Sequence, residues 1–110
     1  MADYHEHADL ERLPDLQKLA PAEFAAFVEM DNIVGRTGGA IPVKYRELLA
    51  LAVAFTTQCP YCLDVHTANA KRAGATREEL AETAFIAAAL RAGAAVTHAT
   101  LALKLFDKAP

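Results

Sequence analysis

The sequence is poor in several features that mark particular classes of protein. It has two cysteines and no tryptophan in 110 residues, and its longest apolar run, at 48–55, is far shorter than the roughly 20 residues of a membrane span. Basic residues are few and scattered, with 11 Lys and Arg against 14 Asp and Glu, for a net charge of -3. We therefore expect no membrane span and no nucleic-acid binding, because no positive patch is available for phosphates.

Targeting and cofactor motifs are missing as well. The first residues, MADYHEHADLERLPDL, lack the basic stretch and the apolar stretch of a secretory signal, which favours a cytoplasmic protein. In that reducing compartment a close cysteine pair is more often redox-active or metal-binding than a structural disulfide. The glycine-rich GRTGG at 35–39 is interpreted as a plain loop, because it lacks the preceding strand and the Lys-Ser/Thr ending of a phosphate-binding loop. We expect no bound cofactor.

The sequence is rich in alanine and leucine, with 54% hydrophobic residues and little of the alternation that is typical of strands. We predict one all-α domain over 1–110, of about five to six helices, with a polar lead-in at 1–20. The 25 alanines make thin helices, and so small a domain buries little surface by itself, so we expect self-association. Residues 42–58 are apolar around nearly the whole circumference, which predicts a buried helix. From prolines, caps and glycine breaks, including one at Gly93, the expected helices are 21–34, 42–58, 59–74, 76–91 and 94–106.

The two cysteines stand three residues apart in QCPYCLDVH, at a predicted helix start. With Cys59 at the N-cap, Pro60 takes the first helical position, where its missing N–H is harmless. The unpaired N–H groups and the helix dipole then favour a thiolate. A non-helical N-cap residue can also approach Cys62 closely enough for a disulfide. His66 lies on the same helix face, four residues after Cys62, and can accept its proton.

Two other interpretations of the cysteines stay open at this point. Both could be buried core residues, as cysteines often are. Together with His66 they could also supply three ligands to zinc, although structural zinc usually takes four ligands and the sequence has no second cysteine pair. In either case the protein would be a structural or zinc-binding oligomer.

A carboxylate stands in the most apolar predicted helix. Glu47 is at about its sixth position, too far in to cap the helix. It could face an edge and pair with Lys44, three residues earlier, in a weak surface contact. Alternatively, it could turn inward and orient His66, as carboxylates do in other proton relays. Sequence periodicity does not decide between these two positions.

Together these residues resemble the Glu-x11-Cys-x2-Cys-x3-His signature of the AhpD-like alkylhydroperoxidase family, within the carboxymuconolactone decarboxylase superfamily. The flanking sequences RELLALAV, HTANAKRAGAT and EELAE are similar too, so the resemblance covers about residues 40–100. It implies an all-helical fold that assembles into trimers or hexamers, and a thiol-dependent peroxidase activity. The decarboxylases of the superfamily generally lack the CxxC pair, which favours redox chemistry here.

The resemblance also implies roles for individual residues. Cys62 would attack the hydroperoxide, Cys59 would then form the disulfide with it, and Glu47 with His66 would form the proton relay. The implied partners are a small hydroperoxide substrate and a dithiol reductant protein, either lipoyl-bearing or thioredoxin-like. A protein disulfide reductase without fast peroxide chemistry is the related alternative. The chain departs from the best-known members at Tyr61, where they carry histidine.

Overall fold

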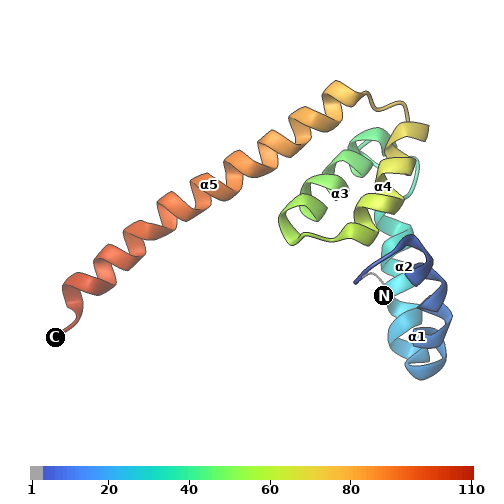
Figure 1. Ribbon diagram of the computed structural model, residues 1–110, viewed down its shortest axis with the longest axis horizontal. Helices are drawn as coiled ribbons and strands as arrows, with labels where there is room; N and C mark the ends of the chain where they lie inside the picture. The colour runs from blue at the N-terminus through green and yellow to red at the C-terminus, as the bar shows by residue number, and fades with distance from the viewer. Residues whose placement is uncertain (1–3) are drawn as a thin grey trace.

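The computed structural model describes residues 4–110, and within this range the chain forms helices joined by short turns, with no β-strand (Figure 1). The predicted all-α class is confirmed. The elements are a short 3₁₀ helix, η1 (His7–Arg12), and five α-helices: α1 (Leu13–Leu19), α2 (Pro21–Val34), α3 (Val43–Thr57), α4 (Pro60–Arg72) and α5 (Arg77–Lys108).

Local sequence signals set the helix starts. Pro21 is the first residue of α2, Pro42 immediately precedes α3, and Pro60 opens α4. At the start of α5 the Thr76 side chain accepts from the Glu79 N–H, and the Glu79 carboxylate accepts from the Thr76 N–H, which is the predicted capping box. These predictions are confirmed.

The predicted break at Gly93 is wrong. Residues 77–108 form one uninterrupted helix of 32 residues. Gly93 has no other group within 4 Å of where its Cβ would lie, and its neighbours are mostly alanine and other helix formers. A single glycine costs a helix only about 1 kcal/mol relative to alanine, so the helix continues through it.

The expected polar lead-in is also more ordered than its composition indicates. Residues 7–19 form η1 and α1, and α1 packs beside α2. The 3₁₀ helix η1 has a capping box of its own between Glu6 and Asp9, and it contacts α4. The N-terminal histidines therefore lie against the body of the protein.

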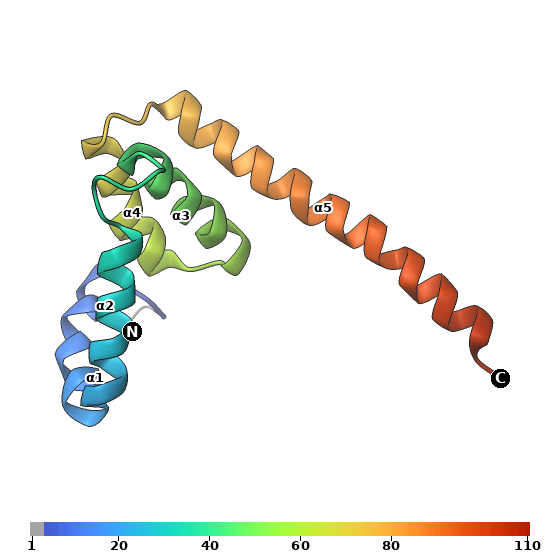
Figure 2. The ribbon, with the colours of Figure 1, turned by 180° about the vertical axis from the view of Figure 1, so that it is seen from behind.

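The core lies where α3 packs against α4 and against the first half of α5 (Figures 1 and 2). Leu48, Leu51 and Ala70 form its centre, and Leu51 is completely buried. The prediction that the 42–58 helix is buried all round is wrong for the single chain. One side of α3 is buried, whereas Leu49 and Val53 on the other side are 54% and 61% exposed.

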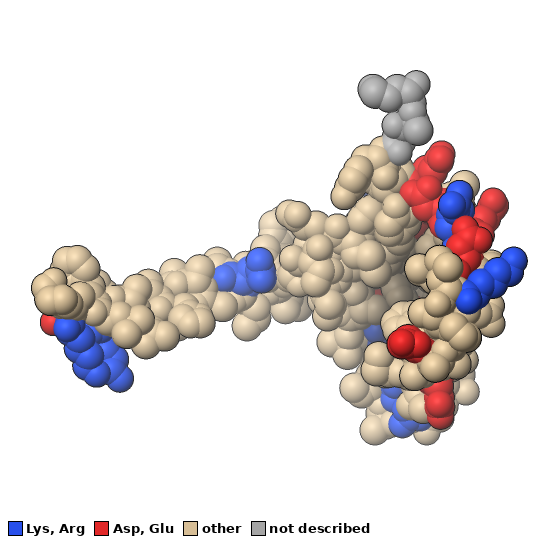
Figure 3. Space-filling view, turned by 90° about the horizontal axis from the view of Figure 1, so that it is seen from below, with Lys and Arg blue, Asp and Glu red and all other residues tan. Residues whose placement is uncertain are grey.

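The second half of α5 extends away from the body as an arm (Figures 1 and 2). Ala87 is the last buried residue along the helix, and everything from 88 onward is exposed. Viewed from below, the arm shows long stretches without charged side chains (Figure 3). By length and composition α5 could cross a membrane, with a mean hydropathy of 1.4 in its most apolar 18 residues. No long uninterrupted apolar run marks this helix in the sequence, and only 6% of that window is buried among the described residues.

Candidate active site

The two cysteines are joined as a disulfide at the start of α4. Cys59 is the N-cap, with an extended backbone, and its Sγ accepts a hydrogen bond from the Cys62 N–H at 3.2 Å. The Cα atoms are 5.3 Å apart, a normal separation for a disulfide. Both residues are half-buried. A sulfur that accepts from a free N–H at a helix start is favoured as a thiolate once the disulfide is reduced.

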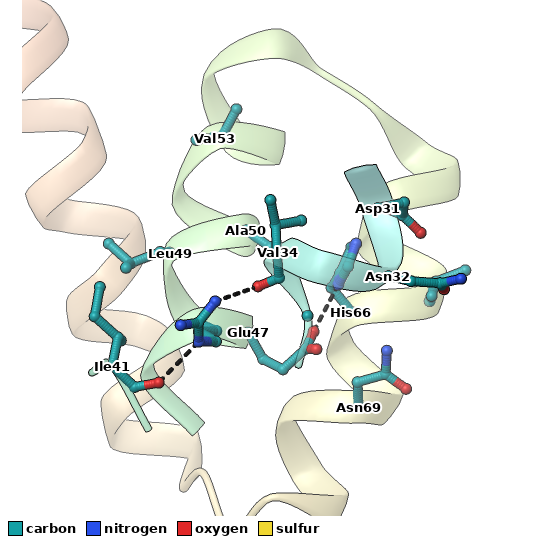
Figure 4. Close-up of a pocket in the computed structure, with 13 residues that line it drawn as sticks. Asp31, Asn32, Val34, Ile41, Glu47, Leu49, Ala50, Val53, His66 and Asn69 are labelled. Atoms are coloured by element: carbon teal, nitrogen blue, oxygen red, sulfur yellow. Dashed lines mark hydrogen bonds and ion pairs between the residues drawn. The ribbon is translucent and has the colours of Figure 1, made fainter. Parts of the chain in front are cut away.

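Glu47 and His66 form the second half of the site. Glu47 projects from the second turn of α3, and its Oε2 lies 2.6 Å from Nδ1 of His66 on α4 (Figure 4). The side chains are 10% and 28% exposed. A carboxylate can only accept, so Nδ1 carries the proton and Nε2 is left with a lone pair. The imidazole is thus oriented as a base that can take a proton and return it.

Lys44 does not pair with Glu47. Its Nζ lies 2.9 Å from Glu79 at the start of α5, where the two side chains are 28% and 29% exposed. The hydrogen bond between them raises the pKa of Lys44 and lowers that of Glu79. Glu47 therefore faces inward toward His66 and does not lie at an edge beside Lys44.

The two halves of the site are connected by α4. His66 follows Cys62 by four residues, so the two side chains project from the same side of the helix in successive turns. Across the described range 4–110, no hydrogen bond joins the imidazole to either sulfur. The α4 backbone places the base one turn from the cysteine pair, close enough for a bridging water to carry a proton between them.

The N-terminal segment contacts the helix turn that carries the cysteines. The Tyr61 hydroxyl donates to Oδ2 of Asp9 at 2.7 Å, and Asp64 pairs with Nδ1 of His7 at the same distance. The hydrogen bond from Tyr61 lowers the pKa of Asp9, and the same bond raises the pKa of Tyr61. Asp9 and Asp64 were not predicted from the sequence, because contacts across 52 and 57 residues leave no local signal.

An open hollow of about 530 Å³ lies beside the Glu47–His66 pair, and we call it the His66 hollow. Polar and apolar side chains line it in equal numbers, and Asp31, Asn32 and Asn69 add polar groups beside the pair (Figure 4). One edge is held by Arg46, which donates to the Val34 carbonyl at 2.7 Å and to the Ile41 carbonyl at 2.8 Å. The apolar side chains that line the hollow are Val34, Ile41, Leu49, Ala50, Val53 and Val65.

The geometry gives no support to the zinc interpretation. In the described part of the chain, no three His, Cys, Asp or Glu side chains converge as metal ligands. His66, the histidine that a zinc site would need, is hydrogen-bonded to Glu47, and the two sulfurs are bonded to each other. Neither cysteine is a simple core residue, because both remain half-exposed at a helix start.

This fold, together with a Cys-x2-Cys pair and a Glu–His pair on adjacent helices, defines a class of small helical proteins. The chain belongs to the carboxymuconolactone decarboxylase family, whose sequence profile matches residues 21–105. His7 and Asp9 lie outside that matched region, whereas their partners Asp64 and Tyr61 lie inside it.

Two relatives and one solved structure support this membership. A Paracoccus denitrificans protein called uncharacterized protein 4 in cox locus is 42% identical over 83 residues, which covers 76% of this chain and 74% of the relative. An uncharacterized Cupriavidus necator protein is 35% identical over 92 residues, 84% and 80% of the two chains. The crystal structure of an apo carboxymuconolactone decarboxylase family protein from Legionella pneumophila matches with a TM-score of 0.67 and 31% identity, over 90% of this chain and 88% of that one.

Proposed function

We propose that the protein is a thiol-dependent hydroperoxide reductase of the alkylhydroperoxidase type. The observation that carries the proposal is the 2.6 Å contact between Glu47 and His66, one helical turn from a cysteine pair that closes as a disulfide. A base oriented by a carboxylate next to an activatable thiol is the arrangement that nucleophilic thiol chemistry needs.

In the proposed cycle, His66 takes the proton of the Cys62 thiol while Glu47 holds the imidazole. The Cys62 thiolate attacks the terminal oxygen of the hydroperoxide, the O–O bond breaks, and His66 returns the proton to the leaving alkoxide as an alcohol. Cys62 is then a sulfenic acid. The Cys59 thiol attacks its sulfur, water leaves, and the disulfide forms. In total, two thiols and one hydroperoxide give one disulfide, one alcohol and one water.

An external dithiol must reduce the disulfide by thiol–disulfide exchange. A lipoyl-bearing or a thioredoxin-like protein supplies this dithiol in our proposal, as the family resemblance implies. We infer a cytoplasmic location, because that compartment keeps dithiols reduced. The alternative function is the reduction of another protein's disulfide without fast peroxide chemistry. The following experiment distinguishes this alternative from a peroxidase.

The test is a thiol titration by mass spectrometry on reduced protein, before and after one equivalent of cumene hydroperoxide. We expect the wild type to lose two thiols as a Cys59–Cys62 disulfide. Glu47→Gln should react more slowly, by up to about 10²-fold, because a neutral amide replaces the charged carboxylate that raises the basicity of the imidazole. Glu29→Gln, an exposed change on α2, is the matched control. Equally slow reaction of wild type and Glu47→Gln would refute the peroxidase proposal and favour protein disulfide exchange.

A further inference from the structure

The 3₁₀ helix η1 contacts α4 on both sides of Cys62. The hydroxyl of Tyr61, the residue just before Cys62, donates to Oδ2 of Asp9 at 2.7 Å. Two residues after Cys62, the Asp64 carboxylate accepts from Nδ1 of His7 at 2.7 Å. In Figures 1 and 2 the N-terminal segment, in dark blue, lies beside the end of α4 where that helix begins. We call these two contacts the η1 clamp.

The clamp holds the part of α4 that the helix itself holds least. The first N–H groups of a helix have no partner within it, and helix ends open more readily than helix centres. In α4 the Cys62 N–H is satisfied by Sγ of Cys59 at 3.2 Å, so Cys59 must stay folded back over the first turn. The disulfide keeps it there. In the reduced protein that bond is gone, whereas the clamp still fixes Tyr61 between the two cysteines.

The acceptor of the Tyr61 hydroxyl is itself held in place. Oδ2 of Asp9 also accepts the Glu6 N–H at 2.9 Å, and the Asp9 side chain belongs to the capping box of η1. The ionic half of the clamp is more open to water, with the His7 and Asp64 side chains 73% and 42% exposed. Exposed ion pairs contribute little to stability. Asp9 is therefore the stronger half of the clamp.

The disulfide and the clamp order the same turn, so each favours the other. With the disulfide closed, the first turn of α4 is already ordered, and the clamp forms at a lower cost in conformational entropy. With the disulfide open, the clamp has to order the turn alone. Such a coupling is reciprocal, so a clamp that binds the oxidised turn more tightly favours the disulfide over the dithiol by the same factor.

We propose that Asp9 is a positioning residue for the cysteine pair. Acting through Tyr61, it holds the first turn of α4 in the shape in which the two sulfurs close as a disulfide. This preference does not depend on what oxidises the pair. Its effect on the catalytic cycle rests on the proposed function: the held turn speeds the attack of the Cys59 thiol on the Cys62 sulfenic acid, with loss of water. Asp9 lies outside the family-matched residues 21–105, so this role belongs to a part of the chain that the family profile does not cover.

The test is the equilibrium of the full-length protein with reduced and oxidised dithiothreitol, in which two electrons and two protons pass from dithiothreitol to the protein disulfide. Alkylation of free thiols followed by mass spectrometry gives the reduced fraction. We expect Asp9→Ala to shift this equilibrium about threefold to tenfold toward the dithiol. Asp9→Asn keeps an acceptor for Tyr61 and should restore most of the wild-type value. Glu11→Ala, an exposed change on the same 3₁₀ helix, is the matched control and should leave it unchanged.

Two results of this measurement would overturn the proposal. The first is an Asp9→Ala protein with the wild-type equilibrium, or with one shifted toward the disulfide. The second is a failure of Asp9→Asn to restore the equilibrium, because the charge of the carboxylate would then act on the sulfurs directly and not through the hydrogen bond.

A double-mutant cycle shows whether Asp9 acts through Tyr61 or only by supporting η1. Tyr61→Phe should shift the equilibrium by a similar factor in the wild type and by almost nothing in Asp9→Ala. Independent shifts that multiply in the double variant would overturn the proposal. Neither measurement uses a peroxide. A protein that shows the expected shifts and yet does not react with cumene hydroperoxide would refute the proposed function alone.

Discussion

At the scale of single residues, Glu47 illustrates why a charged group can persist in an apolar helix. Its carboxylate is nearly buried, and the hydrogen bond from His66 satisfies it. Burying an unpaired carboxylate would be costly, so the partner is part of the reason that the position is tolerated. From sequence, Glu47 was recognisable as unusual and His66 was one of its two possible partners, but periodicity could not choose between His66 and Lys44.

The first residue-scale prediction concerns the base. His66→Gln should lower the second-order rate of Cys62 oxidation by cumene hydroperoxide about 10²- to 10⁴-fold, the usual contribution of a positioned general base. Stopped-flow measurement on the reduced protein checks it. Asn69→Ala, which alters the same hollow without removing an ionisable group, is the control. Similar losses in both variants would mean that the shape of the hollow matters, and not proton transfer.

The second residue-scale prediction concerns the hydrogen bond between Tyr61 and Asp9. This bond lowers the pKa of Asp9 from 3.8, so the stabilisation from that carboxylate is present above pH 3.8 and lost as pH falls through the lowered value. The pKa of Tyr61 is raised from 10.0, so its share is present below pH 10.0 and lost as pH rises through the raised value. Tyr61→Phe should therefore lower the melting temperature at pH 7, with the difference shrinking in acid and in strong base.

Thermal unfolding across pH checks this expectation. Tyr45→Phe is a suitable control, because the Tyr45 hydroxyl makes no hydrogen bond among the described residues. A pH-independent difference between wild type and Tyr61→Phe would show that the phenol acts by packing alone. The contact joins residues 52 apart, which explains why no local pattern predicted it.

At the scale of elements, the starts of the helices followed from the sequence because their causes are local. Pro60 and the Thr76–Glu79 capping box act within one turn, and both were predicted at the right residues. The continuity of α5 was not predicted, because a glycine weakens a helix without ending it unless another signal follows. The incomplete burial of α3 was not predicted either. Hydrophobic residues all around a helix do not show which of its faces the rest of the chain will cover.

The element-scale prediction follows from that continuity. Gly93→Ala should raise the free energy of unfolding by up to about 1 kcal/mol, because alanine is the better helix former and no group stands within 4 Å of the new Cβ. Denaturant unfolding at fixed protein concentration measures it, with Ala94→Gly as the reverse change. A destabilised Gly93→Ala protein would indicate that another helix approaches Gly93 closely in the assembly.

At the scale of the whole molecule, the chain shows few buried residues for its length, with Leu51 the one large side chain that is fully buried among those described. So small a core leaves the single chain weakly stable. We therefore expect the melting temperature to rise with protein concentration over the micromolar range, because assembly stabilises the folded chain by mass action. Calorimetry at several concentrations checks this. A melting temperature independent of concentration, in protein that is shown to be monomeric, would count against assembly.

The disulfide spans only three residues along the chain, within the first turn of α4. The loop that it closes therefore lies inside one helical turn. The contacts of Tyr61 with Asp9 and of Asp64 with His7 join that turn to the N-terminal segment, so η1 is the neighbouring element closest to the sulfur chemistry. We expect a protein that reduces this disulfide to bind at the start of α4 and beside η1, because both sulfurs and both contacts of the N-terminal segment lie there.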